Sequence, residues 1–279
     1  MMKILKIIAS VLKRIFYLNN LKIIKTNTWQ SKKVVEKFYK INNLDNKDIF
    51  NEVHSKLFSN YITNNEKVLD VGCGTGRLLN ILRKFSINCY GLDVSQEMVN
   101  KIENKKNVYI GSVFDIPFDN NFFDIVTSMD LMVHFDETEE ILKEKLKVTK
   151  KQGLVIFNIG SQEHYTLSKN ILKNEFNPIY ENFKTTIYKP YYKTILDDDL
   201  VNLGKKIGFS LVKSVPYNFF SGNNFFRPNI SENFDLSSKF NSYFKNKLFR
   251  DFIIELENKV INSREVALTF YKIVVLRKN

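Results

Sequence analysis

The alternation of apolar and polar positions divides the chain, from residue 66 onward, into short strand-like and longer helix-like segments. Short runs rich in Val, Ile, Leu and Phe predict buried strands, whereas apolar residues that recur every three or four positions predict amphipathic helices. This pattern predicts an α/β fold in which a mainly parallel sheet is covered by helices on both faces. Strands are expected at 67–71, 88–92, 108–110, 123–128, 154–159, 209–215 and 267–276.

Two residues mark the ends of predicted helices. Ser95 can cap the helix after the second strand, whose apolar face carries Met98 and Val99. Gly153 follows the helix predicted at 137–149, near the place where a helix stop is expected. Further helices are expected up to about residue 84, at 197–208 and at 248–260.

The strand–helix rhythm is interrupted by two insertions, 160–196 and 217–262. Residues 161–250 contain 18 Phe or Tyr, and nearly all of these aromatic rings lie outside the predicted sheet. The insertions either line a substrate pocket or pack on each other as a small accessory core, and the sequence leaves both alternatives open. The candidate substrate residues are His164, Tyr188, Tyr191, Tyr192, Phe219, Phe220, Phe225 and Phe226.

The net charge of +12 is concentrated near the N-terminus. Residues 1–40 hold ten Lys or Arg and one acidic residue, which gives +9, whereas residues 41–160 sum to −3 and residues 161–279 to +6. Because the segment with the glycine-rich motif is slightly acidic, the charge distribution argues against a nucleic-acid partner.

Residues 3–18 predict a basic amphipathic helix, with apolar residues such as Ile4 and Ile8 at helical spacing and lysines between them. The segment is too short and too charged to span a bilayer. It either packs on the rest of the chain or makes peripheral contact with an anionic membrane surface. We therefore divide the chain into an N-terminal helical segment, 1–40, and a main domain, 41–279.

A glycine-rich segment, Asp70-Val-Gly-Cys-Gly-Thr-Gly76, closes the first predicted strand and opens a helix. Its glycines would let the backbone turn sharply and approach a ligand with no Cβ in the way. Asp93 ends the next strand, 17 residues after Gly76, where a carboxylate can accept both hydroxyls of a ribose. These residues fall at the carboxyl ends of strands, which is where α/β sheets bind their ligands.

Four segments together resemble the class I S-adenosylmethionine-dependent methyltransferases, in the branch similar to ubiquinone- and menaquinone-pathway enzymes. The resemblance covers about residues 45–160 and, more loosely, 197–215 with the last strand. It implies a Rossmann-like sheet of seven strands, the last one antiparallel, and S-adenosyl-L-methionine as the cofactor. The four segments are Leu69-Asp-Val-Gly-Cys-Gly-Thr-Gly, Gly91-Leu-Asp-Val-Ser-Gln-Glu-Met, Gly111-Ser-Val-Phe-Asp-Ile-Pro-Phe and Phe123-Asp-Ile-Val-Thr-Ser-Met-Asp-Leu-Met-Val-His.

For the methionine end of the cofactor, the resemblance implies contacts from two strand ends. Asp70 and Gly72 would hold this end, while Gly74 and Gly76 would shape the turn beside it. Met129, just past the fourth strand, would offer its carbonyl to the ammonium group.

For the nucleoside end, the resemblance implies that Asp93 binds the ribose hydroxyls and that Val94 and Met98 flank the adenine. The backbone of Ser112 and Val113 would read the adenine edge. The family often has Asp at the position of Ser112, so a hydroxyl without charge would make the contact to the adenine amine here.

His134 is the first candidate for a catalytic base. Methyl transfer from a sulfonium mainly requires alignment of donor and acceptor, and a base helps when the acceptor is a hydroxyl. An imidazole titrates near neutrality, and related quinone-pathway O-methyltransferases have a histidine at the matching place. The alternative is that His134 packs beneath the following acidic helix. Asp130 is the second candidate and could instead orient the substrate.

Four further residues carry expectations of their own. His54 is expected on the surface or shielding the cofactor, and Trp29 in an N-terminal flap over it. Cys73 and Cys89 have neither metal-ligand nor secreted-disulfide spacing, which favours a reducing compartment such as the cytoplasm. No Asp/His cluster has the spacing of a metal-dependent site, so no metal is expected.

The sequence therefore predicts a cytoplasmic methyltransferase acting on a small-molecule acceptor, with an oxygen atom favoured. The acceptor would come from secondary metabolism, quinone or cell-surface glycan assembly. Two alternatives stay open: a methyltransferase acting on RNA or protein, and a cofactor-binding protein without transferase activity. The sequence indicates no particular oligomeric state.

Overall fold

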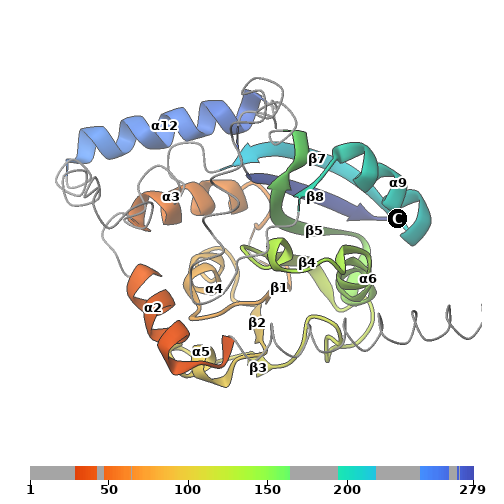
Figure 1. The fold of residues 1–279 in the computed structure, drawn as a ribbon, viewed down its shortest axis with the longest axis horizontal. Coiled ribbons are helices and arrows are strands. Elements are labelled where there is room, and N and C mark those ends of the chain that lie inside the picture. Colours follow the sequence, from red (N-terminus) through yellow and green to blue (C-terminus); the bar gives the residue numbers. More distant parts are fainter. Residues whose placement is uncertain are drawn as a thin grey trace, which may run out of the picture.

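A mainly parallel sheet forms the centre of the protein, with the strand order β3-β2-β1-β4-β5-β8-β7 (Figure 1). The computed structural model describes residues 29–42, 47–63, 65–163, 194–217, 246–263, 269 and 271–279. The strands are β1 (Val68–Val71), β2 (Cys89–Asp93), β3 (Val108–Ile110), β4 (Phe123–Ser128), β5 (Thr149–Ser161), β6 (Thr194–Ile195), β7 (Phe209–Tyr217) and β8 (Tyr271–Lys278). All seven predicted strands are confirmed, and β6 is additional.

The strand directions are those of the predicted Rossmann-like sheet. Strands β1 to β5 run parallel to their neighbours, whereas β8 is antiparallel to both β5 and β7. The carboxyl ends of β1, β2, β4, β5 and β7 therefore lie along one edge of the sheet, the edge at which ligands bind in such folds.

Helices cover both faces of the sheet because successive side chains of a strand point to opposite sides. Val68 of β1 joins an apolar core with α3, α4 and α12, whereas Leu69 and Val71 join the core on the other face with α6 and α9 (Figure 1). The helices are α2 (Lys32–Asn42), α3 (Lys47–Phe58), α4 (Arg77–Leu82), α5 (Gln96–Asn100), η1 (Met132–His134), α6 (Thr138–Val148), α9 (Asp197–Ile207) and α12 (Lys247–Ser263).

Of the two predicted helix-end residues, one is confirmed and one is wrong. Ser95 is the N-cap of α5, and its Oγ accepts a hydrogen bond from the Met98 amide at 3.2 Å. Helix α6 instead ends at Val148, and Gly153 lies inside β5. A Cβ at Gly153 would come within 2.8 Å of the Asp124 carbonyl oxygen, so close strand packing, and not a helix stop, explains the glycine.

The first insertion begins and ends beside the same edge of the sheet. Strand β6 pairs in parallel with the end of β5, aligning Gly160 with Thr194. The buried Lys272 of β8 donates to Glu163 at 2.9 Å and to Asp197 at 2.6 Å, so one lysine joins both ends of the insertion. Residues 164–193 lie outside the described residues.

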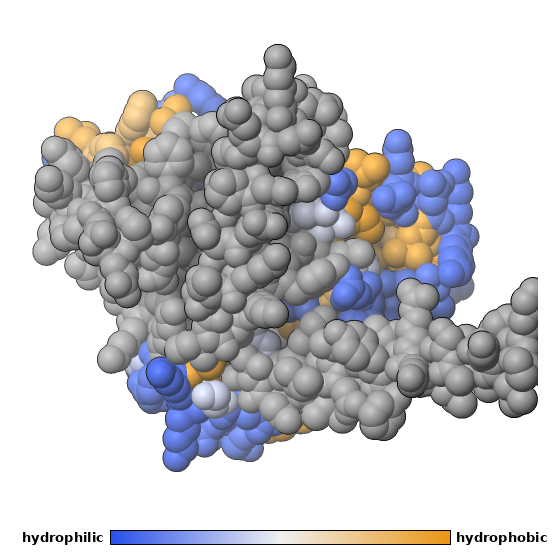
Figure 2. Space-filling view, viewed as in Figure 1, coloured by the Kyte–Doolittle hydropathy of each residue, from blue (hydrophilic) through white to orange (hydrophobic). Residues whose placement is uncertain are grey.

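The second insertion ends in α12, which confirms the helix predicted at 248–260. Ile253 and Ile261 face the core, while Leu248 and Phe252 are 79% and 56% exposed. Figure 2 shows apolar side chains on the outer side of this helix. Residues 218–245 are not described.

The described part of the N-terminal segment packs on the main domain. Glu36 of α2 and Lys101, directly after α5, form an ion pair at 2.5 Å. None of the described helices has the length and apolar composition needed to cross a bilayer. Residues 3–18 lie outside the described residues, so both alternatives for that segment stay predictions, as does the division of the chain at residue 40.

Candidate active site

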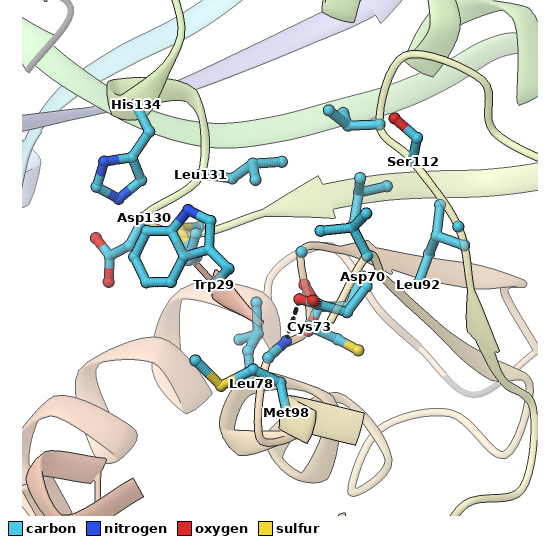
Figure 3. A pocket seen from close by; sticks show the side chains of 18 of the residues that line it. Trp29, Asp70, Cys73, Leu78, Leu92, Met98, Ser112, Asp130, Leu131 and His134 are labelled. Carbon is cyan, nitrogen blue, oxygen red and sulfur yellow. Dashed lines mark hydrogen bonds between the residues drawn. The ribbon is translucent and has the colours of Figure 1, made fainter. Parts of the chain in front are cut away.

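A pocket opens at the carboxyl edge of the sheet, and most of the predicted cofactor residues line it. Figure 3 shows Trp29, Asp130 and His134 gathered at one end of this pocket and Leu92 and Ser112 at the other. The predicted cofactor residues on its wall are Asp70, Gly72, Gly74, Asp93, Val94, Met98, Ser112, Val113 and Met129. Gly76 is not on the wall, because its Cα faces Ile102, 3.1 Å from where a Cβ would lie.

The glycine loop presents its backbone to the pocket. Gly74 has a φ of +54°, and a Cβ built there would meet nothing within 4 Å. The left-handed backbone therefore favours glycine, while the space beside it stays open for a ligand. At Gly72, with φ +75°, a Cβ would come within 2.9 Å of the Leu131 side chain, so the loop and the end of β4 approach closely.

Asp93 ties the end of β2 to this loop. Its Oδ2 accepts a hydrogen bond from the Gly74 amide at 2.8 Å, and its Oδ1 accepts one from the Ser95 amide at 2.8 Å. Burial raises the pKa of Asp93, and the amide donors act in the opposite direction. A carboxylate oxygen has two acceptor positions, so both oxygens keep capacity for ligand hydroxyls.

Asp70 provides a buried carboxylate oxygen without a protein partner. Its side chain is 1% exposed, and Oδ2 makes no hydrogen bond. Burial raises the pKa of Asp70 to about 7, opposed by the positive charges of Arg77 and Lys145. An unsatisfied buried carboxylate is costly, and because Asp70 lines the pocket, a cationic ligand group would relieve that cost.

Lys145 of α6 is a buried cation beneath the same strands. Its Nζ donates to Ser128 Oγ and lies 5.5 Å from the centroid of the Phe157 ring. Burial lowers the pKa of Lys145 to about 7, opposed by the charge of Asp70. Sequence reasoning missed this residue, although a lysine in line with the apolar Ile141 on one helix face was a detectable anomaly.

The end of β4 carries the two predicted catalytic residues. Asp130 has a φ of +59°; its amide donates to Asn158 Oδ1 at 2.6 Å, and its Oδ1 accepts from Asn158 Nδ2 at 2.7 Å. His134 ends the short η1 helix and lines the pocket with Asp130. The fully buried Asn158 on β5 thus fixes Asp130 through two hydrogen bonds.

Trp29 closes the pocket on the His134 side. The two rings lie 5.2 Å apart at 57°, and the Trp29 carbonyl accepts a hydrogen bond from Ser95 Oγ at 2.7 Å. Ser95 therefore caps α5 and also anchors the described start of the chain.

At the adenine end, Ser112 differs from the aspartate that the family often has there. Its Oγ accepts a hydrogen bond from the Phe114 amide at 3.2 Å. Sequence reasoning did not select the neighbouring wall residues, which are Val71, Cys73, Thr75, Arg77, Leu78, Leu92, Gly111, Phe114, Leu131 and Phe135. Burial raises the pKa of the Cys73 thiol, which disfavours its nucleophilic thiolate form.

The prediction of a surface position for His54 is wrong. His54 is fully buried, because it lies under α4 between Arg77 and Tyr217. It is not on the pocket wall. The predicted substrate residues in the insertions, His164, Tyr188, Tyr191, Tyr192, Phe219, Phe220, Phe225 and Phe226, all lie outside the described residues.

A metal centre finds no support in the described ranges, where no group of three His, Cys, Asp or Glu side chains is placed to hold an ion. The expectation that the protein uses no metal stays a prediction.

Comparison with known proteins agrees with this geometry. Residues 69–157 match the family model described as "Methyltransferase domain". Residues 69–157 therefore carry the domain of the class I S-adenosylmethionine-dependent methyltransferases.

Two relatives and one solved structure illustrate the similarity. An uncharacterised protein of Methanocaldococcus jannaschii is 33% identical over 130 residues, which are 46% of this chain and 50% of that protein. Ajmaline N-methyltransferase of Rauvolfia serpentina is 31% identical over 111 residues, 36% of this chain and 38% of that protein. The chain thus spans half, or less, of the length of these two relatives.

The structural similarity extends further than the sequence similarity. Magnesium protoporphyrin IX methyltransferase from Synechocystis PCC 6803, solved with bound SAH, superposes with a TM-score of 0.57 at 13% identity. The superposition covers 92% of this chain and 100% of that chain, and at this identity it establishes the fold alone.

Proposed function

We propose that the protein transfers the methyl group of S-adenosylmethionine to a small-molecule acceptor, with a hydroxyl oxygen as the favoured acceptor atom. The observation that carries the proposal is that His134 and Asp130 line the same pocket as Gly74 and Asp93. A base and the candidate cofactor residues therefore share one cavity.

The residues present fit the cofactor. The unpartnered Oδ2 of Asp70 suits its ammonium group, and the open backbone at Gly74 leaves room for close approach. Asp93 would hold the ribose, Val94 and Met98 would flank the adenine, and Ser112 would meet its edge. When bound, the cofactor supplies a methyl group activated by the positive charge on sulfur.

His134 would act on the acceptor. Its imidazole would take the hydroxyl proton as the acceptor oxygen forms a bond to the methyl carbon and the carbon–sulfur bond breaks. Asp130, fixed by Asn158, would orient the acceptor beside it. The Trp29 ring would cover this end and limit the access of water.

A small-molecule acceptor is favoured by the position of the insertions and by one relative. Both described ends of the first insertion, and the start of the second at Tyr217, lie at the pocket edge of the sheet. The aromatic residues between those ends would cover the pocket and suit an acceptor with apolar faces. Ajmaline N-methyltransferase acts, by its name, on nitrogen, so a nitrogen acceptor is the second candidate.

The test is transfer of a labelled methyl group to matched acceptors that offer a phenolic hydroxyl, an aromatic amine or a thiol on the same ring. Label on the phenol supports the proposal, and label on the amine alone would overturn the choice of oxygen. Label on RNA or protein substrates alone would overturn the small-molecule proposal. Cofactor binding with no transfer to any acceptor would favour the inactive alternative.

A further inference from the structure

Arg77 is a positively charged residue among those that line the pocket. It is the first residue of α4, directly after the glycine loop, and it lines the pocket. Burial lowers the pKa of Arg77, while Tyr217, Asp130 and Asp70 act in the opposite direction. A guanidinium does not deprotonate in proteins, so Arg77 keeps its charge in this pocket.

A buried relay holds this guanidinium from behind. Arg77 Nη1 donates to Asn51 Oδ1 at 3.1 Å and contacts His54 Nδ1 at 3.0 Å, both on α3. Because arginine can only donate, Nδ1 must accept, and the proton of the neutral His54 ring sits on Nε2. That Nε2–H then donates to Tyr217 Oη, at the end of β7.

The relay is rigid and lies outside the pocket. His54 and Tyr217 are both fully buried, and their rings stack with centroids 5.4 Å apart. Neither ring lies on the pocket wall. Their hydrogen bonds therefore fix where Arg77 points without contacting a ligand themselves.

The charges around Arg77 are complementary to a zwitterion. The carboxylate of Asp70, whose Oδ2 has no hydrogen-bond partner, lies near enough to Arg77 to influence its pKa, and both residues line the pocket. Carboxylates attract an ammonium group, and a guanidinium binds a carboxylate through charge-assisted hydrogen bonds. An α-amino-acid group carries both charges on adjacent atoms, which matches this arrangement.

We infer that Arg77 binds the carboxylate of the amino-acid end of the cofactor, and that His54 and Tyr217 are positioning residues that act through Arg77. The inference rests on the proposed function, since it requires S-adenosylmethionine in this pocket. It adds a carboxylate-binding arginine to the motif residues and assigns a role to the buried histidine.

The test compares the binding of two ligands by titration calorimetry. S-adenosylhomocysteine carries the amino-acid end, whereas 5′-methylthioadenosine has the same nucleoside and sulfur without it. Arg77→Gln should weaken S-adenosylhomocysteine binding about tenfold or more, as expected for loss of a charged hydrogen bond, and leave 5′-methylthioadenosine within about twofold. Arg77→Lys, which keeps the charge without the planar fork, should give an intermediate loss.

The positioning residues are tested by the same ratio of affinities. Tyr217→Phe and His54→Gln should each lower the preference for S-adenosylhomocysteine over 5′-methylthioadenosine about threefold, because the guanidinium is less well oriented. Arg83→Gln is the matched control. Its guanidinium donates to Asn104 and Lys106 carbonyls near the other end of α4, so its ratio should stay unchanged.

Each outcome separates the inference from the proposed function. If the wild-type protein binds neither ligand, the proposed function fails. If the wild type binds both and Arg77→Gln weakens them equally or not at all, only the inference is overturned. The inference is also overturned if Arg77→Gln leaves the ratio of the two affinities unchanged but abolishes a preference of the wild-type enzyme for acidic acceptors. Arg77 would then bind the acceptor and not the cofactor. Circular dichroism and thermal unfolding check that each variant is folded.

Discussion

The two ends of the pocket are built in different ways. At the glycine-loop end, main-chain amides meet a carboxylate from the next strand, as in the 2.8 Å bond from the Gly74 amide to Asp93 Oδ2. At the opposite end, Trp29 faces His134 across 5.2 Å, although one residue precedes α2 and the other follows β4. The first end depends on local backbone geometry, and the second on packing between distant segments.

The difference separates what is common to the family from what is particular to this chain. Main-chain donors present the same chemistry whatever the neighbouring side chains are, so the glycine-loop end suits one invariant cofactor. Side chains gathered from distant segments can change one at a time, so the Trp29–His134 end suits a variable acceptor. Substitutions should therefore affect cofactor binding at one end and turnover at the other.

His134→Ala should have the largest effect and should confine it to turnover. Loss of a general base lowers kcat by about 100-fold or more with a hydroxyl acceptor, while affinity for S-adenosylhomocysteine should stay within about twofold. Steady-state kinetics and calorimetry on the same preparation check this. Retained turnover would mean that His134 only packs beneath α6.

Asp93→Ala, in contrast to His134→Ala, should weaken cofactor binding. Removing the carboxylate should weaken cofactor binding by roughly 1–3 kcal/mol, because a charged hydrogen bond and the anchor of Gly74 are lost together. Calorimetry with S-adenosylhomocysteine measures the effect. Asp119→Ala, an exposed carboxylate away from the pocket wall, is the control. Equal affinity in the two variants would remove Asp93 from the site.

Cofactor affinity should fall as the pH drops below about 7. Burial raises the pKa of Asp70 to about 7 and lowers the pKa of Lys145 to about 7, so both groups gain a proton below that pH. Each protonation makes the site less attractive to an ammonium group, and the loss should approach about tenfold per pH unit for each proton that binding must displace. Above pH 7 the affinity should level off.

Binding of 5′-methylthioadenosine, which lacks the ammonium group, should not show this dependence. Asp70→Asn should flatten the profile for S-adenosylhomocysteine. A profile that stays steep in that variant would show that another group near the pocket titrates.

The same two pKa shifts predict how the free energy of unfolding depends on pH. The pKa of Asp70 is higher in the folded protein than in the unfolded chain, so its contribution to stability declines as the pH rises from about 4 to 7. The pKa of Lys145 is lower in the folded protein, so its contribution improves from pH 7 towards 10. Chemical denaturation should therefore show that Asp70→Asn gains most in unfolding free energy, relative to wild type, near and above pH 7.

Trp29→Ala should have the smallest effect and should raise the KM of the acceptor about three- to tenfold, because one aromatic contact is lost. Trp29→Phe should recover most of the loss. If affinity for S-adenosylhomocysteine falls instead, Trp29 belongs to the cofactor end, and the boundary between the two ends lies closer to His134.

Much of the fold was predictable, because strand ends and glycine turns are determined mainly by residues that are close together in the sequence. The left-handed turn at Gly74 and the cap at Ser95 depend on backbone geometry within a few residues. Gly153 was misassigned because its tight contacts, with Asp124 on another strand and with Thr149 and Lys150, arise where the chain passes from α6 into β5.

The part of the site that escaped sequence reasoning depends on distant partners. Arg77 was visible as an anomaly, since a cation in the first turn opposes the positive end of the helix dipole. The position of its guanidinium depends on the contact between His54 and Tyr217, which are 163 residues apart in the chain. The burial of His54 could not be read from α3 alone, because α4 and β7 provide it.

The place of β8 in the sheet has a consequence for how the protein is made. This strand follows every other described strand in the sequence, yet it lies between β5 and β7 and pairs with both along most of its length. During synthesis, the edges of β5 and β7 that pair with β8 stay unpaired until Tyr271 and the residues after it emerge from the ribosome. Exposed strand edges invite pairing with other chains. A chain interrupted before Tyr271 would contain every residue of the pocket and still be prone to aggregate.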